Sequence, residues 1–317
     1  MANIALLNRC NLRCPYCFAD AYTEGEREDI TVDTFLSLLD FCAQDGTIGL
    51  IGGEPLLHKS IREILEILKN DWRIRQVTLF TNGIFLDKIM DLVSISKLIT
   101  LVNVNSKRDI GEGNFAKMCA NLEELLLRVS KERVTLGINV YEVGQDFSNF
   151  LFLVKKHGFR RIRISVVIPQ DKNEGGISYF MKMKPTLLSL YRDLKELGVS
   201  PCYDCNAIPE CIYTDEERAF LETLPFENSY EREIFSGKRS VCSPVIDIYP
   251  DKTATRCFGM YDRGRVSILD FKNIEDLRNY FFMKQDCTLV HKKSRSECEG
   301  CYKFNTFGCF GGCLCYK

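Results

Sequence analysis

The residues of this sequence that could carry out chemistry are its cysteines. The chain has 317 residues, of which 16 are Cys and only 3 are His. Clustered, reduced Cys are typical of metal ligands or catalytic thiols. The scarcity of His favours sites built from thiolates alone, which hold zinc or iron–sulfur clusters. Fourteen Cys fall into three groups: Cys10, Cys14 and Cys17 at the start, Cys202, Cys205 and Cys211 in the middle, and Cys242, Cys257, Cys287, Cys298, Cys301, Cys309, Cys313 and Cys315 in the last quarter.

The first group has the spacing Cys10-x3-Cys14-x2-Cys17 and directly follows a short apolar segment, residues 4–7. Three thiolates on one loop can each bind one corner of a cubane iron–sulfur cluster. Because full protein ligation of such a cluster needs four Cys, three of them leave one iron open to another ligand. A zinc ribbon would normally supply four ligands from paired C-x2-C units. A zinc knot or three unpaired thiols is the alternative interpretation.

The composition argues against several other classes of protein. With 42 Lys+Arg against 43 Asp+Glu, the net charge of −1 argues against nucleic-acid binding through a large basic face. No apolar run approaches the roughly 18 residues of a membrane span, and the start lacks the roughly 7–15 apolar residues of a secretory signal. We therefore expect a cytoplasmic globular protein that uses neither nucleic acid nor membrane as a partner. Its thiols should stay reduced.

Alternating strands and helices must position the cysteine groups. Apolar segments alternate with helical periodicity over the first 200 residues, which predicts right-handed βαβ units and a parallel sheet. Six units fit an α/β fold with a partial (β/α)6 barrel, and ligands of such folds bind beyond the carboxyl ends of the strands. Cys42 and Cys119 lie inside helices and are expected in the core. The predicted strands are residues 4–7, 47–51, 76–80, 99–104, 134–140 and 161–168, and the predicted helices are 31–44, 59–70, 86–96, 115–129, 147–157 and 185–197.

Polar segments follow several of the predicted strands. Gly52-Gly53-Glu54-Pro55 follows the second, where two glycines let the backbone come close to a ligand and a carboxylate suits an ammonium group. Thr81-Asn82-Gly83 follows the third strand, and the later strand ends offer Asn105, Asn139 and Ile168. Ordinary turns and barrel packing are the alternative interpretation of these segments.

These motifs, taken together with the first cysteine group, resemble those of the radical S-adenosylmethionine (radical SAM) superfamily. The resemblance covers roughly residues 1–200 and includes an aromatic residue, Tyr16, before the third Cys. It implies that Cys10, Cys14 and Cys17 hold a [4Fe–4S] cluster whose open iron binds the amino and carboxylate groups of S-adenosyl-L-methionine (SAM). It also implies that an electron from this cluster cleaves SAM and that the resulting 5′-deoxyadenosyl radical abstracts a hydrogen from a substrate.

The resemblance further implies a set of SAM-binding residues along the strand ends. The Gly-Gly-Glu-Pro motif would hold the methionyl amino group, and Ile168 would flank the adenine. Family members often have Ser and then Asp at the end of the fourth strand, so Asn105 departs from the pattern and its contact with the ribose is in doubt. The predicted SAM-binding residues are Tyr16, Phe18, Gly52, Gly53, Glu54, Pro55, Thr81, Asn82, Asn105, Asn139 and Ile168.

The last cysteines resemble the SPASM extension, which carries auxiliary iron–sulfur clusters in radical SAM enzymes. Lys252 stands where that family usually has glycine, and the spacer between Cys301 and Cys309 is longer than typical. The resemblance implies two auxiliary [4Fe–4S] clusters, one on Cys242, Cys257 and Cys313 and the other on Cys298, Cys301, Cys309 and Cys315. The fourth site of the first is either open to substrate or filled by Cys287 or a middle Cys. The alternative is a structural zinc ribbon on Cys298, Cys301, Cys309 and Cys313.

The middle cysteines allow three interpretations: an extra cluster ligand, a thiol that donates a hydrogen atom to a substrate radical, or structural thiols. For the second role, we name Cys205 and Cys211 as catalytic candidates. A redox-active thiol has to be accessible, which the sequence cannot show. We expect a radical SAM barrel over residues 1–200, a bridge or lid over 201–240, and an auxiliary-cluster domain over 241–317.

The resemblance favours post-translational modification of a ribosomally made peptide, by cross-linking, epimerisation or thioether formation. The first predicted strand starts close to Met1, so we expect no N-terminal leader-binding domain and a separate recognition protein or direct docking of the peptide. A reductant such as flavodoxin or ferredoxin would supply the electron. One alternative is a radical SAM dehydrogenase or mutase of a small molecule. Another, of a different class, is a non-catalytic zinc or iron–sulfur scaffold or electron carrier.

Overall fold

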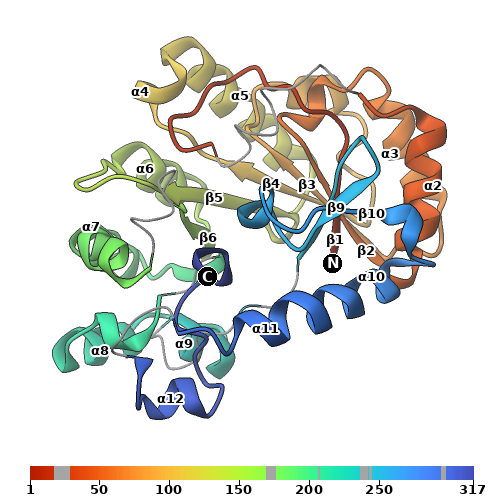
Figure 1. Cartoon of the computed structure of the whole chain (residues 1–317). Coiled ribbons are helices and arrows are strands. Elements are labelled where there is room, and N and C mark those ends of the chain that lie inside the picture. Colours follow the sequence, from red (N-terminus) through yellow and green to blue (C-terminus); the bar gives the residue numbers. More distant parts are fainter. Residues whose placement is uncertain (18–28, 169–175, 206–207, 236–241, 243–244, 294–297) are drawn as a thin grey trace. The chain divides into compact units, whose positions relative to one another are not determined.

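The computed structural model has α/β structure in two compact units (Figure 1). It describes residues 1–17, 29–168, 176–205, 208–235, 242, 245–293 and 298–317. The first unit comprises Met1–Thr135 and Pro244–Phe282, and the second comprises Leu136–Ser243 and Met283–Lys317. Both units therefore draw on separate stretches of the chain.

Four parallel strands in chain order form the centre of the first unit. They pair with one another in register, and every residue of the first strand is buried, as expected of a parallel sheet covered on both faces. Thr31 caps the first helix by accepting a hydrogen bond from the N–H of Thr34, as its sequence position predicts. The elements are β1 (Ala2–Ala5), α2 (Val32–Cys42), η1 (Ala43–Asp45), β2 (Thr47–Ile51), η2 (Pro55–Leu57), α3 (Ile61–Asn70), β3 (Gln76–Thr81), η3 (Leu86–Ile89), β4 (Leu98–Asn103), α4 (Lys107–Ile110), α5 (Glu112–Arg128) and η4 (Lys131–Arg133).

A segment from the far end of the sequence completes this unit. Strand β8 (Ile246–Ile248) pairs in parallel with β1, and β9 (Thr253–Thr255) and β10 (Val266–Ser267) continue the sheet in antiparallel fashion. In Figure 1 these blue strands lie beside the red β1. Asn3 Nδ2 donates to Asp247 Oδ1 over 2.7 Å, and both residues are buried. Gly49 leaves room for this pair, because a Cβ there would lie 2.0 Å from Asn3 Oδ1. Three helices follow: η7 (Phe258–Met260), η8 (Ile268–Asp270) and α10 (Ile274–Phe281).

The second unit holds three further parallel strands, again in chain order. The helices between them are amphipathic, with the apolar side chains buried. The elements are β5 (Val134–Val140), α6 (Ser148–His157), β6 (Arg161–Val166), α7 (Ile177–Glu196), β7 (Ser200–Cys205), η6 (Glu210–Ile212), α8 (Asp215–Glu222), α9 (Ser229–Phe235), η9 (Phe282–Asp286), α11 (Cys287–Leu289), α12 (Tyr302–Asn305) and η11 (Leu314–Tyr316).

The α/β class and all six predicted strands are confirmed, but the sequence did not predict β7 or β8–β10. Proline in an apolar run argues against a strand, yet Pro201 pairs with Ile162 in β7. Within the second unit β7 pairs with β6 alone, and proline is tolerated on an edge strand. The three predicted domains stay a prediction, with β7 lying across the proposed boundary near residue 200.

The predicted helix over residues 86–96 was wrong, since only Leu86–Ile89 is helical and the remainder forms turns. The guanidinium of Arg133 explains why this irregular backbone is stable. It donates to the carbonyl oxygens of Val93 (2.9 Å), Ser94 (3.3 Å) and Leu98 (3.1 Å). One side chain therefore satisfies carbonyl groups that a helix would have bonded internally.

Helix α7 begins at Ile177, eight residues before the predicted start at Pro185. Proline favours the first turn of a helix, which suggested that start. Here Pro185 is tolerated in the interior because the buried stripe, from Phe180 to Leu187 and Leu194, continues through it. In the described part of the chain, no helix is long and apolar enough to cross a membrane.

Candidate functional site

The cysteine loop that follows β1 packs directly against the glycines that follow β2. The N–H of Gly53 donates to Leu7 O (3.2 Å), and the N–H of Glu54 donates to Arg9 O (3.0 Å). A Cβ on Gly53 would lie 2.2 Å from Arg9 O, and one on Gly52 would lie 2.5 Å from Leu7 O. The close approach of the two backbones therefore requires both glycines. The sequence suggested that these glycines let the backbone approach a ligand, and this stays a prediction. In the structure they let the backbone approach the cysteine loop.

Glu54 is buried, with 1% of its surface exposed, and its carboxylate joins the ends of β2 and β3. One oxygen accepts from Thr81 Oγ1 (2.8 Å) and from the N–H of Leu56 (3.1 Å), and the other accepts from the N–H of Asn82 (2.8 Å). Burial raises the pKa of Glu54 to about 7, against the opposing effect of these donors. Pro55 is buried at the first position of η2, where its missing N–H costs nothing. The interpretation of Glu54 as a ligand for an ammonium group stays a prediction.

Asparagines connect the end of β3 to the cysteine loop. Asn82 Nδ2 donates to Asn11 Oδ1 (2.9 Å), and its Oδ1 accepts from the N–H of Ile84 (3.0 Å). Asn121 of α5 donates to the carbonyl oxygens of Gly83 and Ile84, each over 2.9 Å. We did not predict a role for Asn11 or Asn121. The sequence signal that could have indicated Asn121 is its polar side chain on the otherwise apolar, buried stripe of α5.

Asn105, just after β4, also contacts the cysteine loop. The hydroxyl of Tyr16 donates to Asn105 Oδ1, and the Cys14 Sγ lies 3.9 Å from the same oxygen. Tyr16 and Asn105 are both buried. The structure thus brings this residue to the predicted cluster, although its predicted contact with a ribose stays untested.

The environment of Cys10 fits a site that binds positively charged iron. Burial, with smaller contributions from Glu54, Cys14 and Cys17, raises the pKa of the Cys10 thiol to about 12. The N–H of Leu12 donates to Cys10 Sγ (3.4 Å) and opposes this rise. Ionisation of the thiols would thus depend on the positive charge of bound iron. An N–H directed at sulfur is also a common feature of iron–sulfur ligation.

Cys17 packs against a buried cluster of Ala5, Ile51 and Tyr249. Phe80, Phe258 and Tyr261 complete this cluster as half-buried side chains. The ring centroid of Tyr249 lies 5.8 Å from that of Phe258 and 5.0 Å from that of Tyr261, both edge-on. We call the aromatic side chains of this cluster the aromatic wall. Phe258 directly follows Cys257, so this predicted ligand of an auxiliary cluster is next in sequence to the wall that Cys17 contacts. The sequence analysis did not predict this wall.

The late cysteines are distributed over both units. Cys257 belongs to the first, whereas the others in the two predicted auxiliary sets belong to the second. The N–H of Gly311 donates to Cys309 Sγ (3.2 Å), and the sulfurs of Cys313 and Cys315 lie 3.2 Å apart. Among the described residues, no three His, Cys, Asp or Glu side chains are grouped as ligands of a metal ion. The assignment of Cys242, Cys257 and Cys313 to one cluster and of Cys298, Cys301, Cys309 and Cys315 to another stays a prediction.

The middle cysteines have different environments. Cys202 lies early in β7, opposite Arg163, and its Sγ accepts from Arg161 (3.4 Å). Cys205 ends β7, but its side chain lies outside the described part of the structure. Cys211 is exposed in η6, which meets the access requirement of a redox-active thiol.

Not all of the predicted SAM-binding residues belong to the described part of the first unit. Asn139 and Ile168 belong to the second unit, where Asn139 Oδ1 accepts from Arg163 (3.2 Å) and Ile168 follows β6. Phe18 lies outside the described residues. The site in the first unit therefore contains all the other predicted residues: Tyr16, Gly52, Gly53, Glu54, Pro55, Thr81, Asn82 and Asn105.

His58, which follows the Gly-Gly-Glu-Pro motif, has a structural position. It is 2% exposed, and its Nδ1 accepts from the N–H of Ser60 (3.1 Å). The proton therefore sits on Nε2, which donates to Ile30 O (2.8 Å). Both ring nitrogens are engaged by the backbone.

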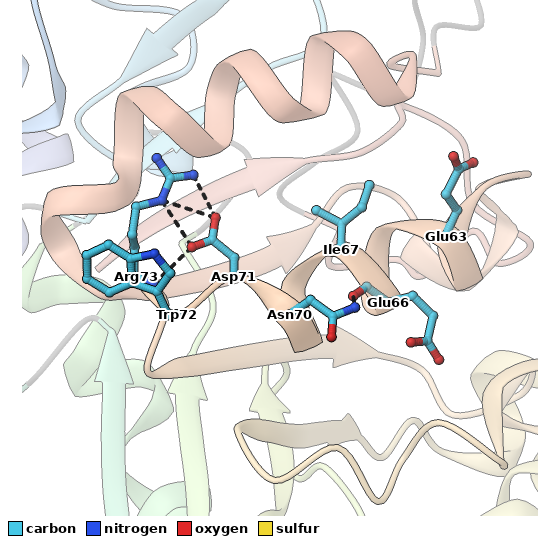
Figure 2. A pocket seen from close by; sticks show the side chains of 7 residues that line it. All are labelled: Glu63, Glu66, Ile67, Asn70, Asp71, Trp72 and Arg73. Carbon is cyan, nitrogen blue, oxygen red and sulfur yellow. Dashed lines mark hydrogen bonds and ion pairs between the residues drawn. The ribbon is translucent and has the colours of Figure 1, made fainter.

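A surface hollow lies at the carboxyl end of α3 (Figure 2). Figure 2 shows Arg73 bonded to Asp71 beside Trp72, which is 87% exposed. These residues precede β3, whereas the candidate site follows the strand ends. The hollow is therefore not part of that site.

The family comparison agrees with the geometry around the cysteine loop. Residues 4–107 match the model of the radical SAM superfamily. Residues 4–107 of the chain therefore carry a radical SAM domain. The family implies SAM and one [4Fe–4S] cluster, and the Cys-rich C-terminal region fits an auxiliary-cluster domain.

The relatives that match in sequence are GTP 3′,8-cyclases. The chain is 33% identical over 157 residues to a GTP 3′,8-cyclase of Clostridium perfringens, covering 46% of this chain and 47% of the relative. It is 26% identical over 184 residues to a probable GTP 3′,8-cyclase of Methanococcus vannielii, covering 54% and 59%. The chain thus spans about half the length of the curated relatives it matches.

Solved structures match nearly the whole chain. The structure of anSMEcpe with bound AdoMet and Cp18Cys peptide superposes with a TM-score of 0.65 at 19% identity, over 98% of this chain and 88% of that one. The structure of Streptococcus suis SuiB bound to S-adenosylmethionine gives a TM-score of 0.58 at 14% identity, over 96% and 70%. These likenesses confirm the fold class, a partial barrel with a Cys-rich extension.

The buried carboxyl of Glu54 predicts a pH-dependent stability. Because folding raises its pKa from 4.5 to about 7, the folded state holds a proton that the unfolded state has lost between these values. The unfolding free energy should therefore fall as pH rises from about 4.5 to 7 and level off above 7. In Glu54→Gln, we expect urea unfolding to show an unfolding free energy that lacks this fall between pH 4.5 and 7.

The matched control is Glu112→Gln, because Glu112 is 87% exposed. The other carboxyl groups contribute equally to the pH dependence of both variants. Their contributions therefore cancel when the unfolding free energy of each variant is compared with that of the native protein. Parallel curves of native protein and Glu54→Gln between pH 4.5 and 7 would contradict the expectation.

Proposed function

We propose that this radical SAM enzyme modifies a ribosomally made peptide. The observation that carries the proposal is the fold likeness over 95–98% of the chain, including its Cys-rich region, to anSMEcpe and SuiB. The structure of the first is described with a bound peptide, and that of the second with its precursor peptide SuiA. The substrate would reach the carboxyl ends of the strands, and a separate recognition protein or direct docking would select it.

In this proposal the residues around the cysteine loop would bind SAM beside the cluster that the three cysteines of this loop would hold. When bound, SAM and the cluster on Cys10, Cys14 and Cys17 supply a carbon radical that removes a substrate hydrogen. Glu54 fixes the ends of β2 and β3 relative to each other, and Asn82 and Asn105 connect the ends of β3 and β4 to the loop. The buried Tyr16 and the aromatic wall exclude water from this side of the loop.

We assign two auxiliary [4Fe–4S] clusters to the late cysteines, and a flavodoxin or ferredoxin as reductant. The buried Cys298, Cys313 and Cys315 and the N–H that points at Cys309 Sγ support a sulfur-ligated site. Cys205 and Cys211 are the candidate hydrogen-atom donors, and the exposure of Cys211 supports its accessibility. Of the three proposed domains, the last would contain both auxiliary sites.

A second candidate is a reaction on a small molecule. The curated relatives are GTP 3′,8-cyclases, and they support it through sequence identity over about half the chain. A purine nucleotide is the substrate class that their names supply.

One experiment separates these candidates and the non-catalytic alternative. Anaerobically reconstituted enzyme is given dithionite and SAM, with either GTP or the peptide encoded by a short reading frame beside its gene. We expect the peptide to raise 5′-deoxyadenosine formation about tenfold and to change in mass by mass spectrometry. Stimulation by GTP alone would replace the peptide proposal with the nucleotide one. Absence of 5′-deoxyadenosine in every mixture would leave only the scaffold or electron carrier.

A further inference from the structure

The segment that carries the first cysteine group is closed at its base by backbone contacts. Leu7 and Asp29 form an isolated antiparallel bridge, and the N–H of Ile30 donates to Leu6 O over 3.0 Å. All three cysteines of the first group lie between these two points in the sequence. Because closing a segment at its ends removes conformational freedom from the residues between them, this base restricts the positions of the thiols.

The side chain of Arg9 joins this base to a third segment. Its Nε donates to Asp29 Oδ1 (3.0 Å), and its Nη2 donates to Asp29 Oδ2 (2.5 Å). The same Nη2 donates to Leu57 O (2.9 Å), at the end of η2. One planar guanidinium group thus bonds three oxygen atoms, which the single ammonium group of a lysine could not reproduce. We call these three hydrogen bonds the Arg9 clamp.

The main chain of Arg9 is held as well, because its carbonyl oxygen accepts from the N–H of Glu54 (3.0 Å). The side chains of the clamp are partly buried, with 32% of Arg9 and 19% of Asp29 exposed. Charge-assisted bidentate pairs of this kind fix geometry as well as contributing energy. Since Cys10 is the next residue along the chain, its position depends directly on how firmly Arg9 is held.

We infer that Arg9 is a positioning residue, and that the Arg9 clamp holds Cys10 in place for cluster binding. The inference rests on the proposed function, which supplies the cluster. All the bonds of the clamp join protein groups of the first unit. A thiol that is already held in place loses less conformational freedom when it binds iron, so the clamp favours formation of the cluster.

A second arginine of the same unit provides a matched control. Arg62 Nη1 and Nη2 donate to the two oxygens of Asp91 (2.7 and 2.5 Å), and Nη1 also donates to Lys88 O (2.8 Å). This arrangement repeats that of the Arg9 clamp, a bidentate carboxylate with one carbonyl oxygen. Its three residues lie outside the segment of the first cysteine group.

The first test measures the alkylation of individual thiols in the iron-free, full-length chain. Iodoacetamide is added under anaerobic conditions, and mass spectrometry of the digested protein gives the rate at each cysteine. In Arg9→Gln and in Asp29→Asn, we expect Cys10 to react about tenfold faster than in the native chain, because the segment opens locally more often. Arg62→Gln should leave the rate at Cys10 unchanged.

Two features of this test separate local opening from other effects. The two substitutions remove charges of opposite sign, so an electrostatic effect on the Cys10 thiol would shift its two rates in opposite directions. Cys42 is fully buried in α2 and reacts only on global unfolding, so its rate should stay native in both variants. If Arg9→Gln does not fold, Arg9→Lys takes its place with the same expected rise, because lysine keeps the charge and loses the fork.

The second test uses the reconstituted full-length enzyme and a ferrous chelator. We expect Arg9→Gln to release its most labile iron about tenfold faster than the native enzyme, whereas Arg62→Gln releases it at the native rate. An equal rate of release in all three proteins overturns the inference.

The alkylation rates can overturn the inference independently of any cluster. Native rates at Cys10 in both clamp variants do so, as does an equal rise at Cys10 and Cys42. A native chain in which Cys42 reacts as fast as Cys10 also does so. The proposed function fails separately, if the native enzyme forms no 5′-deoxyadenosine from SAM and dithionite, and that result leaves the alkylation rates as a test of the clamp.

Discussion

Replacing Cys17 with alanine is expected to abolish the formation of 5′-deoxyadenosine. Three thiolates hold the radical-generating cluster in the family, so loss of one leaves two iron sites without a protein ligand. In the proposed function, the reaction starts with electron transfer from this cluster, and no other described group replaces it. We expect SAM cleavage to fall at least about a thousandfold and the protein to lose about four iron ions. The measurements are liquid chromatography of the nucleoside and an iron assay after anaerobic reconstitution.

Cys119→Ala is the matched control, because Cys119 is a cysteine of α5 with no assigned role in the cluster; it is only partly buried, whereas the sequence predicted it in the core. It should retain both iron content and SAM cleavage. Retained cleavage in Cys17→Ala, with SAM and dithionite as the only additions, would show that this cysteine group is not the source of the radical.

Gly53→Ala is expected to cause the second largest loss, although it adds one methyl group. Its Cβ would lie 2.2 Å from Arg9 O and 2.8 Å from Cys10 N, so a backbone must move. Because Cys10 follows directly, this movement displaces a predicted cluster ligand. A misplacement of about 1 Å in an active site can cost about a hundredfold in rate, and strained packing costs about 1–3 kcal/mol of stability. We expect both effects, together with partial loss of iron.

Gly113→Ala tests whether these effects are specific to position 53. Gly113 lies in α5, and a Cβ there would meet nothing within 4 Å. Alanine favours a helix over glycine by up to about 1 kcal/mol, so this variant should be as active as the native enzyme and slightly more stable. Native iron content and native activity in Gly53→Ala would show that the glycine is dispensable to the loop.

The sequence predicted the parts of the site that have local signatures. The spacing of Cys10, Cys14 and Cys17 needs only one loop, and Gly52-Gly53-Glu54-Pro55 follows a strand whose periodicity is clear. The structure places these segments in contact, as the alternation of strands and helices predicts. It also shows what the motif could not, namely that the Glu54 carboxylate faces donors from the next strand end.

The remaining parts depend on contacts between distant residues. Strand β7 was not predicted, because sequence alone does not tell that Pro201 lies on an edge strand, where proline is tolerated. The helix predicted over residues 86–96 failed because Arg133, far along the chain, bonds its carbonyl groups. Tyr249 could not be assigned to the wall at Cys17, since nothing local in its segment indicates the pairing of β8 with β1. The Asn3–Asp247 contact was invisible for the same reason.

The pairing of β1 with β8 also has a consequence for how the protein is made. Asn3 and Asp247 are 244 residues apart, and a ribosome adds roughly 5–20 residues per second, so their contact waits about 10–50 s after the first strand emerges. During this interval one edge of β1 lacks its partner, and the cysteine loop lacks the wall that Tyr249 provides. Cluster loading is therefore expected to follow the synthesis of the segment that contains Asp247 and Tyr249.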